Sequence, residues 1–182
     1  MSRTIRSANE GQFYEEQRFT QWWLRGLLLV GTSGTVVAFG YGMLKQLVFG
    51  HPWGNRPMPD AALIIVGSLA ILLMVGITYL FFVMKLITEV HTEDLFIRFF
   101  PFSGQIIPYK NIKRCEARKY HPIREYGGWG IRYSRKGKAY NVSGNHGVQL
   151  QLMNGKAILI GSQRSDELAE VINAHLKRSH LD

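Results

Sequence analysis

The strongest constraint on this chain is a run of 24 residues without a charged side chain, from Ala61 to Met84. As an α-helix this run is ~36 Å long, enough to cross a hydrocarbon core of ~30 Å. A second run, Gly26–Leu44, has 19 uncharged residues but contains five glycines, so it is less apolar. We predict two membrane-spanning helices, about 24–44 and 61–84, because such runs are rare in soluble cores. The alternative is a buried helical hairpin of a soluble protein.

The flanks of the first run also suit a membrane span. Aromatic and basic side chains typical of the lipid headgroup level bracket it: Trp22, Trp23, Arg25, Tyr41, Lys45 and Trp53. The run is too long for the apolar part of a signal peptide and lacks a clear cleavage pattern, so we expect the helix to be retained. Three prolines in the connecting segment 46–60 should stop the helix and make the two spans antiparallel.

The distribution of charge predicts the orientation. Residues 85–182 hold sixteen of the 22 Lys and Arg residues and nine of the 13 acidic residues, which leaves +7 of the net charge of +9. Between the two uncharged runs the only basic residues are Lys45 and Arg56. The positive-inside rule therefore predicts a cell (inner) membrane protein with both termini cytoplasmic. We divide the chain into a polar N-terminal cytoplasmic segment, 1–21, a transmembrane hairpin, 22–85, and a cytoplasmic domain, 86–182.

Small residues recur on one face of the first predicted helix. Gly31, Gly34, Ala38 and Gly42 are three or four residues apart, so another backbone can approach closely there. We expect this face to pack against the second helix of the same chain, and the alternative is the seam of a homodimer. Neither span carries an acid, a base or a histidine at mid-membrane depth, which disfavours a transport function.

Beyond residue 85 the hydrophobic pattern changes to strand-like alternation with frequent turn residues. We predict strands at 86–91, 95–100, 105–107, 112–118, 129–134, 139–142, 147–153 and 156–161. Asn154-Gly155 favours a type I′ turn. A final helix, 165–178, begins with Ser165 and has acids in its first turn and bases in its last. The expected fold is α+β: a transmembrane hairpin, then a small antiparallel β-barrel or sandwich with a C-terminal helix.

Several strands followed by one amphipathic helix is the element order of a pleckstrin-homology-like (PH-like) barrel. Residues 86–178 resemble the bacterial PH-like domains that are fused to a pair of membrane helices. The run from Ile107 to Ile112 and the segment 121–130, HPIREYGGWG, are similar to an uncharacterised bacterial membrane protein family of this layout. The resemblance implies an architecture and no activity. Lipid-binding PH domains have Lys and Arg in their first hairpin loop, whereas segment 91–94 reads HTED, so phosphoinositide recognition is not implied.

The segment that most suggests a binding site is 118–140, where cations alternate with aromatic side chains. The candidate contact residues are Arg118, Lys119, Arg124, Tyr126, Arg132, Arg135, Lys136 and Lys138. These side chains suit an anionic lipid headgroup, a small anionic ligand or a protein partner. The same pattern also fits strands that turn aromatic side chains inward and charges outward. Glycines in the segment match neither a P-loop nor a dinucleotide fingerprint.

We predict no catalytic residue, metal site or cofactor. The histidines are scattered, Cys115 is the only cysteine, and no nucleophile motif is present. An RNA-binding motif is also missing, so no specific nucleic acid is expected. The predicted partners are membrane lipids and a protein partner or a second copy.

The first functional hypothesis is a non-catalytic interaction or scaffold module at the inner membrane face. The alternative is a sensor or enzyme that binds an anionic headgroup or small ligand through 118–140. A deep pocket in which these side chains converge would favour the alternative.

Overall fold

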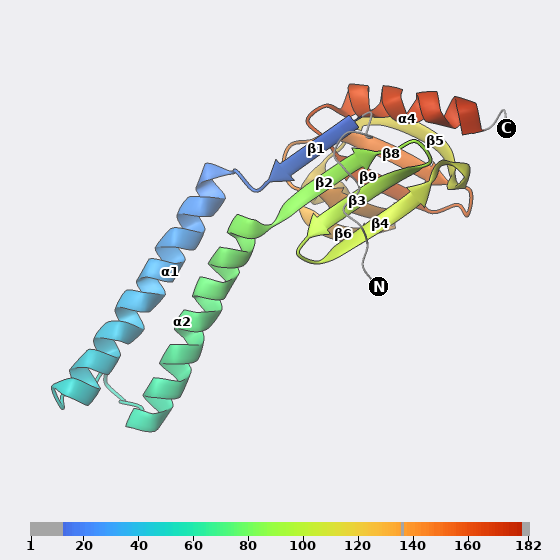
Figure 1. Cartoon of the computed structure of the whole chain (residues 1–182). Coiled ribbons are helices and arrows are strands. Elements are labelled where there is room, and N and C mark those ends of the chain that lie inside the picture. The colour runs from blue at the N-terminus through green and yellow to red at the C-terminus, as the bar shows by residue number, and fades with distance from the viewer. Residues whose placement is uncertain (1–12, 136, 180–182) are drawn as a thin grey trace. The chain divides into compact units, whose positions relative to one another are not determined.

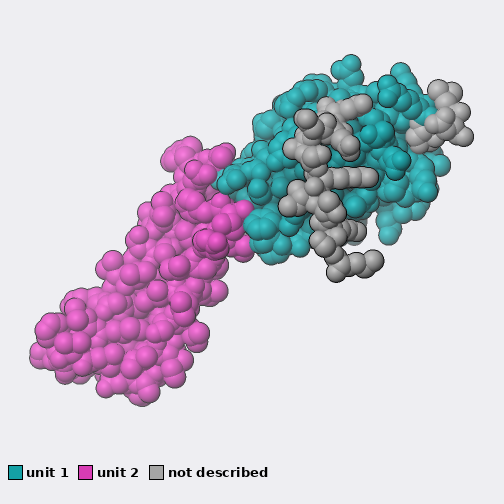
Figure 2. Space-filling view, in the orientation of Figure 1, with its two compact units in different colours: residues 1–19, 84–182 teal, residues 20–83 magenta. Residues whose placement is uncertain are grey.

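A computed structural model describes residues 13–135 and 137–179, which form two compact units (Figure 2). One unit is the continuous segment 20–83. The other combines the described residues on either side of that segment. Figure 1 shows that the first unit consists of helices and that the second contains two β-sheets and a C-terminal helix.

The helical unit contains α1, Trp22–Met43, a π-helical turn at Leu44–Val48, and α2, Asp60–Val83. Both helical segments, 22–48 and 60–83, are long and apolar enough to cross a membrane. Apolar helices are therefore present at the two predicted positions, 24–44 and 61–84. The helices pack against each other, and the side-chain oxygens of Thr32 and Thr78 are 2.7 Å apart across this contact.

Nine strands in the described residues form two separate sheets. Sheet A has the order β1-β2-β3-β4, and its neighbouring strands are all antiparallel. Its strands are β1 Phe13–Arg18, β2 Lys85–Val90, β3 Asp94–Phe100 and β4 Ser103–Pro108. Sheet B has the order β5-β8-β9-β7-β6. Its strands are β5 Ile112–Lys119, β6 Gly130–Ser134, β7 Gly137–Asn141, β8 His146–Leu152 and β9 Ala157–Gly161.

The eight strands expected after residue 85 are confirmed, each within two residues at both ends. Among the described strands, the barrel alternative of the expected antiparallel β-barrel or sandwich is not found, and neither is its purely antiparallel pairing. The described strands form two sheets and no closed barrel, and β7 and β9 are parallel. β7 and β8 run in opposite directions, and β9 lies between them. Because β9 is antiparallel to its hairpin partner β8, it is parallel to β7.

β1 was not anticipated by the sequence analysis, which placed its residues in a polar N-terminal segment. It pairs along its whole length with β2, with Phe13 opposite Val90 and Arg18 opposite Lys85. The helical unit is therefore inserted between two neighbouring strands of one sheet. Phe13, Glu15 and Gln17 point inward and are buried, so the polar sequence of β1 hides an inward face.

Short helical elements and α4 complete the second unit. A 3₁₀ turn occupies Tyr109–Asn111, α3 is Pro122–Tyr126, and α4 is Ser165–Ser179. α4 packs on β5 and β8, and its Leu168, Ile172 and Leu176 are buried. The turn between β8 and β9 is not type I′, because only glycines among the described residues have positive φ. The turn instead runs from Leu152 to Gly155 and is closed by the Gly155 N–H, which donates to the Leu152 carbonyl at 3.0 Å. Gly155, the last residue of this turn, has φ of +79°.

Candidate functional site

The candidate residues of segment 118–140 come from four elements of sheet B and its surroundings: β5, α3, β6 and β7. Strand alternation divides them between two faces. Tyr133 lies opposite Lys138 in the β6–β7 register, and Arg132 lies opposite Ala139. Because neighbouring residues of a strand point to opposite faces, Arg132 and Tyr133 cannot line one pocket wall.

Arg118 belongs to a hydrogen-bonded network that joins β5, α3 and β8. Its Nη2 donates to Glu125 Oε2 at 3.0 Å and to Gln149 Oε1 at 3.0 Å, and it lies 3.3 Å from the hydroxyl of Tyr126. Glu125 Oε1 also accepts the backbone N–H of His121 at 2.9 Å. Burial alone would lower the pKa of Arg118, but the hydrogen bond and charge of Glu125 outweigh it and raise that pKa. Arg118 therefore links α3 to β5 and β8, and its guanidinium is engaged in these internal hydrogen bonds.

Lys138 is also engaged within the fold. Its ammonium lies 4.5 Å from the ring centroid of Tyr140 and 5.2 Å from that of Tyr133. Tyr140 is fully buried, and its hydroxyl donates to Gln105 Oε1 of β4 at 3.1 Å. This group of side chains connects the edge of sheet A to sheet B.

The remaining described candidates are spread over the surface. Lys119, Arg124, Arg132 and Arg135 are exposed, whereas Tyr126 is buried, and Lys136 lies outside the described residues. Arg132 Nε donates to the Trp129 carbonyl at 2.9 Å. The described candidates are thus divided into a structural part and an exposed part, and the structure does not gather them around one cavity.

Two of the exposed candidates, Arg124 and Arg132, belong to a region that we call the α3–β6 surface. It comprises Ile123, Arg124, Arg132, Tyr133 and the outer edge of β6, with Arg132 and Tyr133 on opposite sides of that edge. Ile123 is 69% exposed and Tyr133 75% exposed. α3 packs beside β6, and β6 is the last strand of sheet B. Within the described residues, no strand pairs with the outer edge of β6.

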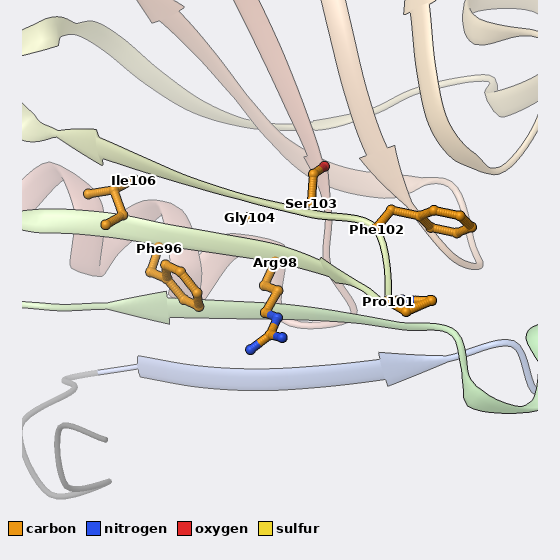
Figure 3. A pocket seen from close by; sticks show the side chains of 7 residues that line it. All are labelled: Phe96, Arg98, Pro101, Phe102, Ser103, Gly104 and Ile106. Atoms are coloured by element: carbon orange, nitrogen blue, oxygen red, sulfur yellow. The ribbon is translucent and has the colours of Figure 1, made fainter. Parts of the chain in front are cut away.

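A groove that sequence analysis missed lies on the outer face of sheet A (Figure 3). Its volume is about 470 Å³, and we call it the sheet A groove. It is lined by Phe96, Arg98, Pro101, Phe102, Ser103, Gly104 and Ile106. The sequence signal was the alternation of β3, in which Phe96 and Arg98 lie between the buried residues Leu95, Ile97 and Phe99.

The small residues of α1 are used unequally. A Cβ added to Gly31 would lie 3.3 Å from Met74 Cε on α2, and one added to Gly42 would lie 2.5 Å from the ring of Trp53. Gly34 has no atom within 4 Å of such a Cβ, and Ala38 is exposed. Two of the four predicted packing residues therefore face the rest of the hairpin, and two do not.

Cys115 is buried and carries no nucleophilic character. Burial, with a smaller contribution from the charge of Glu116, raises the pKa of its thiol to about 12. The thiolate required for nucleophilic attack is therefore strongly disfavoured at neutral pH. In the part of the chain that the structure describes, no three His, Cys, Asp or Glu side chains gather as a set of metal ligands.

Comparison with known proteins identifies a family and no function. No curated protein matches the chain. One family model, described as a family of unknown function (DUF6141), matches residues 18–178. The match extends from the last residue of β1 into α4, so it includes both apolar helices, sheet A apart from most of β1, and sheet B. The chain therefore belongs to this family of unknown function, DUF6141.

Proposed function

We propose that the chain is a membrane-anchored, non-catalytic interaction module. In this proposal α1 and α2 span the cell (inner) membrane, and the β-rich unit is a PH-like domain that binds a protein partner at the cytoplasmic face. The observation that carries the proposal is a pair of uncovered apolar helices inserted between two paired strands.

The surface of the helices supports a membrane environment. Only 11% of the most apolar stretch of α2 is buried, and Leu72 in its middle is 67% exposed. Monomeric soluble proteins rarely leave a continuous apolar patch larger than a few hundred Å² in water. Lipid would cover these side chains at no such cost, which favours a membrane-spanning pair over a hairpin that extends into solvent.

The connections to sheet A support an arrangement with both ends of the hairpin on one side of the membrane. Three residues, 19–21, join β1 to α1, and Met84 alone joins α2 to β2. Three residues extend at most ~10 Å, far less than the ~30 Å of a hydrocarbon core. Because β1 and β2 are paired, the chain has to enter the membrane and return from it on the same side. The excess of Lys and Arg in that unit favours the cytoplasmic face.

The α3–β6 surface is the proposed site for the protein partner. An unpaired strand edge can accept a further strand from another chain through main-chain hydrogen bonds. Tyrosine and arginine are the side chains most enriched at energetically important interface positions, and Tyr133, Arg124 and Arg132 flank this edge. The alternative of a sensor or enzyme with a site in segment 118–140 is less well supported, because Arg118 and Lys138 are committed to internal contacts.

The PH-like assignment rests on element order. A four-stranded antiparallel sheet, a second sheet and a closing amphipathic helix follow each other, with Leu168, Ile172 and Leu176 of that helix in the core. The parallel pair β7 and β9 is a departure from a simple antiparallel meander. The assignment predicts that other PH-like domains superpose on β2–β5 and α4 better than on β6–β9.

Photo-crosslinking in intact membranes tests this function. A photoreactive residue is placed at Arg124 or at Tyr133, and captured molecules are identified by mass spectrometry. The control position is Glu170, an exposed residue of α4, a helix whose main contacts are with β5, β8 and the turn at Tyr109–Asn111. We expect one and the same protein adduct from both test positions and not from the control. Capture of lipid or a small anion alone, or no specific adduct, would contradict protein docking at this surface.

A further inference from the structure

The outer face of sheet A differs from an ordinary solvated sheet face. Phe96 and Arg98 of β3 point outward, and the register places them opposite Ile106 and Gly104 of β4. Ile106 is exposed, and Phe102 in the following turn is 59% exposed. The absent side chain of Gly104 leaves the space between its neighbours open, which produces the sheet A groove (Figure 3). The groove therefore combines apolar walls with one guanidinium.

The strand register also determines the end of sheet A at which the exposed ring of Phe102 lies. Lys85 lies opposite Phe100 on one side and opposite Arg18 on the other. Arg18 and Lys85 are the residues at which the chain leaves sheet A for the helical unit and returns from it. The turn that contains Pro101 and Phe102 follows Phe100 directly, so it lies at this same end of the sheet.

Arg98 differs from the other two cations at this end. Arg18 and Lys85 each form an ion pair with Glu16, at 2.7 Å in both cases. Arg98 lies over the ring of Phe100, 5.5 Å from its centroid, and within the described residues no carboxylate pairs with it. Arg98 is exposed, and its guanidinium can donate hydrogen bonds to an anion.

We infer that the sheet A groove binds an anionic phospholipid of the bilayer in which α1 and α2 reside. The lipid phosphate pairs with Arg98, and the glycerol and first acyl carbons contact Phe96, Phe102 and Ile106. The inference rests on the proposed function in one respect, since α1 and α2 must span a membrane. It does not depend on a protein partner at the α3–β6 surface.

Two properties select a lipid over a soluble anion. Exposed aromatic side chains beside cations are the groups that concentrate at the level of lipid headgroups. A soluble phosphate would pair with Arg98 but leave Phe102 and Ile106 exposed to water, so it would not explain the apolar walls of the groove. Charge complementarity with the anionic cytoplasmic leaflet adds to the attraction.

The test uses the full-length protein in nanodiscs of phosphatidylcholine with or without phosphatidylglycerol. A photoreactive residue is placed at Phe102, and lipid adducts are quantified by mass spectrometry. Leu72, in the middle of α2, is the positive control for membrane insertion, and Ile123 on α3 is the exposed apolar control. The charge is tested with Arg98→Gln, matched by Lys156→Gln at an exposed position of the β8–β9 turn. Gly104→Leu tests the space by filling the groove.

We expect phosphatidylglycerol adducts at Phe102, enriched over phosphatidylcholine, and none at Ile123. Arg98→Gln should reduce the enrichment about fivefold, the effect of one cation near anionic lipid. Gly104→Leu should reduce the total adduct, and Lys156→Gln should change neither. Lipid adducts at Leu72 but none at Phe102, or an enrichment insensitive to Arg98→Gln, would overturn the inference and leave the proposed membrane insertion intact. Absence of lipid adducts at Leu72 would overturn the membrane-spanning proposal and this inference with it.

Discussion

The carboxylate of Glu15 accepts a hydrogen bond from the hydroxyl of Ser162 at 2.6 Å, across 147 residues of sequence. Its other oxygen accepts the backbone N–H of Gln163 at 2.8 Å. Glu15 is buried in β1, and Ser162 begins the turn that leads into α4. The strand that precedes the first apolar helix is thus fastened to both sheet A and the C-terminal part of the fold.

Cys115 offers a direct readout of the stability of this unit. It is the only cysteine of the chain and is 5% exposed on β5, so a thiol reagent reaches it only when the unit opens. Its alkylation rate in nanodiscs therefore reports the free energy of opening of the β-rich unit, without a need to unfold the helices.

The contact of Glu15 gives the first prediction. Glu15→Ala leaves the buried Ser162 hydroxyl and the Gln163 N–H without their acceptor, which should lower the free energy of opening by about 2 kcal/mol. That loss corresponds to a roughly 30-fold faster alkylation of Cys115. Glu170→Ala, at an exposed position of α4, is the control and should leave the rate unchanged. An unchanged rate in Glu15→Ala would contradict a stabilising role of these two hydrogen bonds.

The second prediction separates a structural role of Arg118 from a binding role. Arg118→Met removes the ion pair with Glu125 and the hydrogen bonds to Gln149, so it should lower the free energy of opening by about 1–2 kcal/mol. Arg124→Met, at an exposed position of α3, should change it by less than about 0.5 kcal/mol. Equal alkylation rates in the two variants would mean that the Arg118 network does not stabilise the unit.

The third prediction concerns pH and His91. Burial lowers the pKa of His91, but hydrogen bonds to Asp94 at 2.9 Å and Glu89 at 3.1 Å outweigh it and leave the pKa above its ordinary value of 6.5. A raised pKa in the folded state stabilises the fold below the unfolded pKa, and this gain disappears as pH rises through the folded pKa. The difference in opening free energy between the native chain and His91→Gln should therefore be larger near pH 6 than near pH 8.

The pKa of His175 is shifted in the opposite direction, because burial and the nearby Arg178 lower it. Its contribution is present in both proteins and cancels in the difference. Cys115 alkylation has its own pH dependence, which is calibrated on the denatured chain. A difference that grows with pH would contradict the assignment of His91 as a stabilising cation.

The fourth prediction concerns the packing of α1 on α2. A Cβ added to Gly67 meets Met43 and lies 2.9 Å from Phe39 Cδ1, whereas one added to Gly34 meets nothing within 4 Å. Gly67→Leu should therefore push the helices apart, and Gly34→Leu should be tolerated. Cysteines introduced at Thr32 and Thr78 in a Cys115→Ala background measure the separation through their disulfide yield. Equal yields in both glycine variants would contradict this packing.

Sequence reasoning succeeded where the signal was local. The apolar length of α1 and α2, the alternation of β2 and β3, and the acidic start and basic end of α4 are each contained in one segment. These features predicted the elements to within a few residues. The type I′ turn failed because Asn154 keeps negative φ and only Gly155 adopts positive φ, a choice that the dipeptide alone does not determine.

The misses involve partners that are distant in sequence. β1 has a polar sequence, and its inward residues Glu15 and Gln17 become tolerable in the core only through Ser162, Gln163 and Gly161. The sequence left two interpretations of segment 118–140 open, and the tertiary contacts separate its residues: Arg132 and Tyr133 fall on opposite faces of β6, and Arg118 is held by Glu125. The sheet A groove depends on the β3–β4 register, which sets Gly104 beside Arg98.

Cysteine accessibility in intact cells tests the central claim, a membrane hairpin inserted between paired strands, most directly. Single cysteines replace Tyr14 on β1, Asn55 between the helices and Asn154 between β8 and β9, all exposed, in a Cys115→Ala background. A membrane-impermeant maleimide should label the cysteine at 55 in intact cells, and those at 14 and 154 only after permeabilisation. Labelling of 14 and 154 from opposite sides, or of all three from one side, would contradict the account.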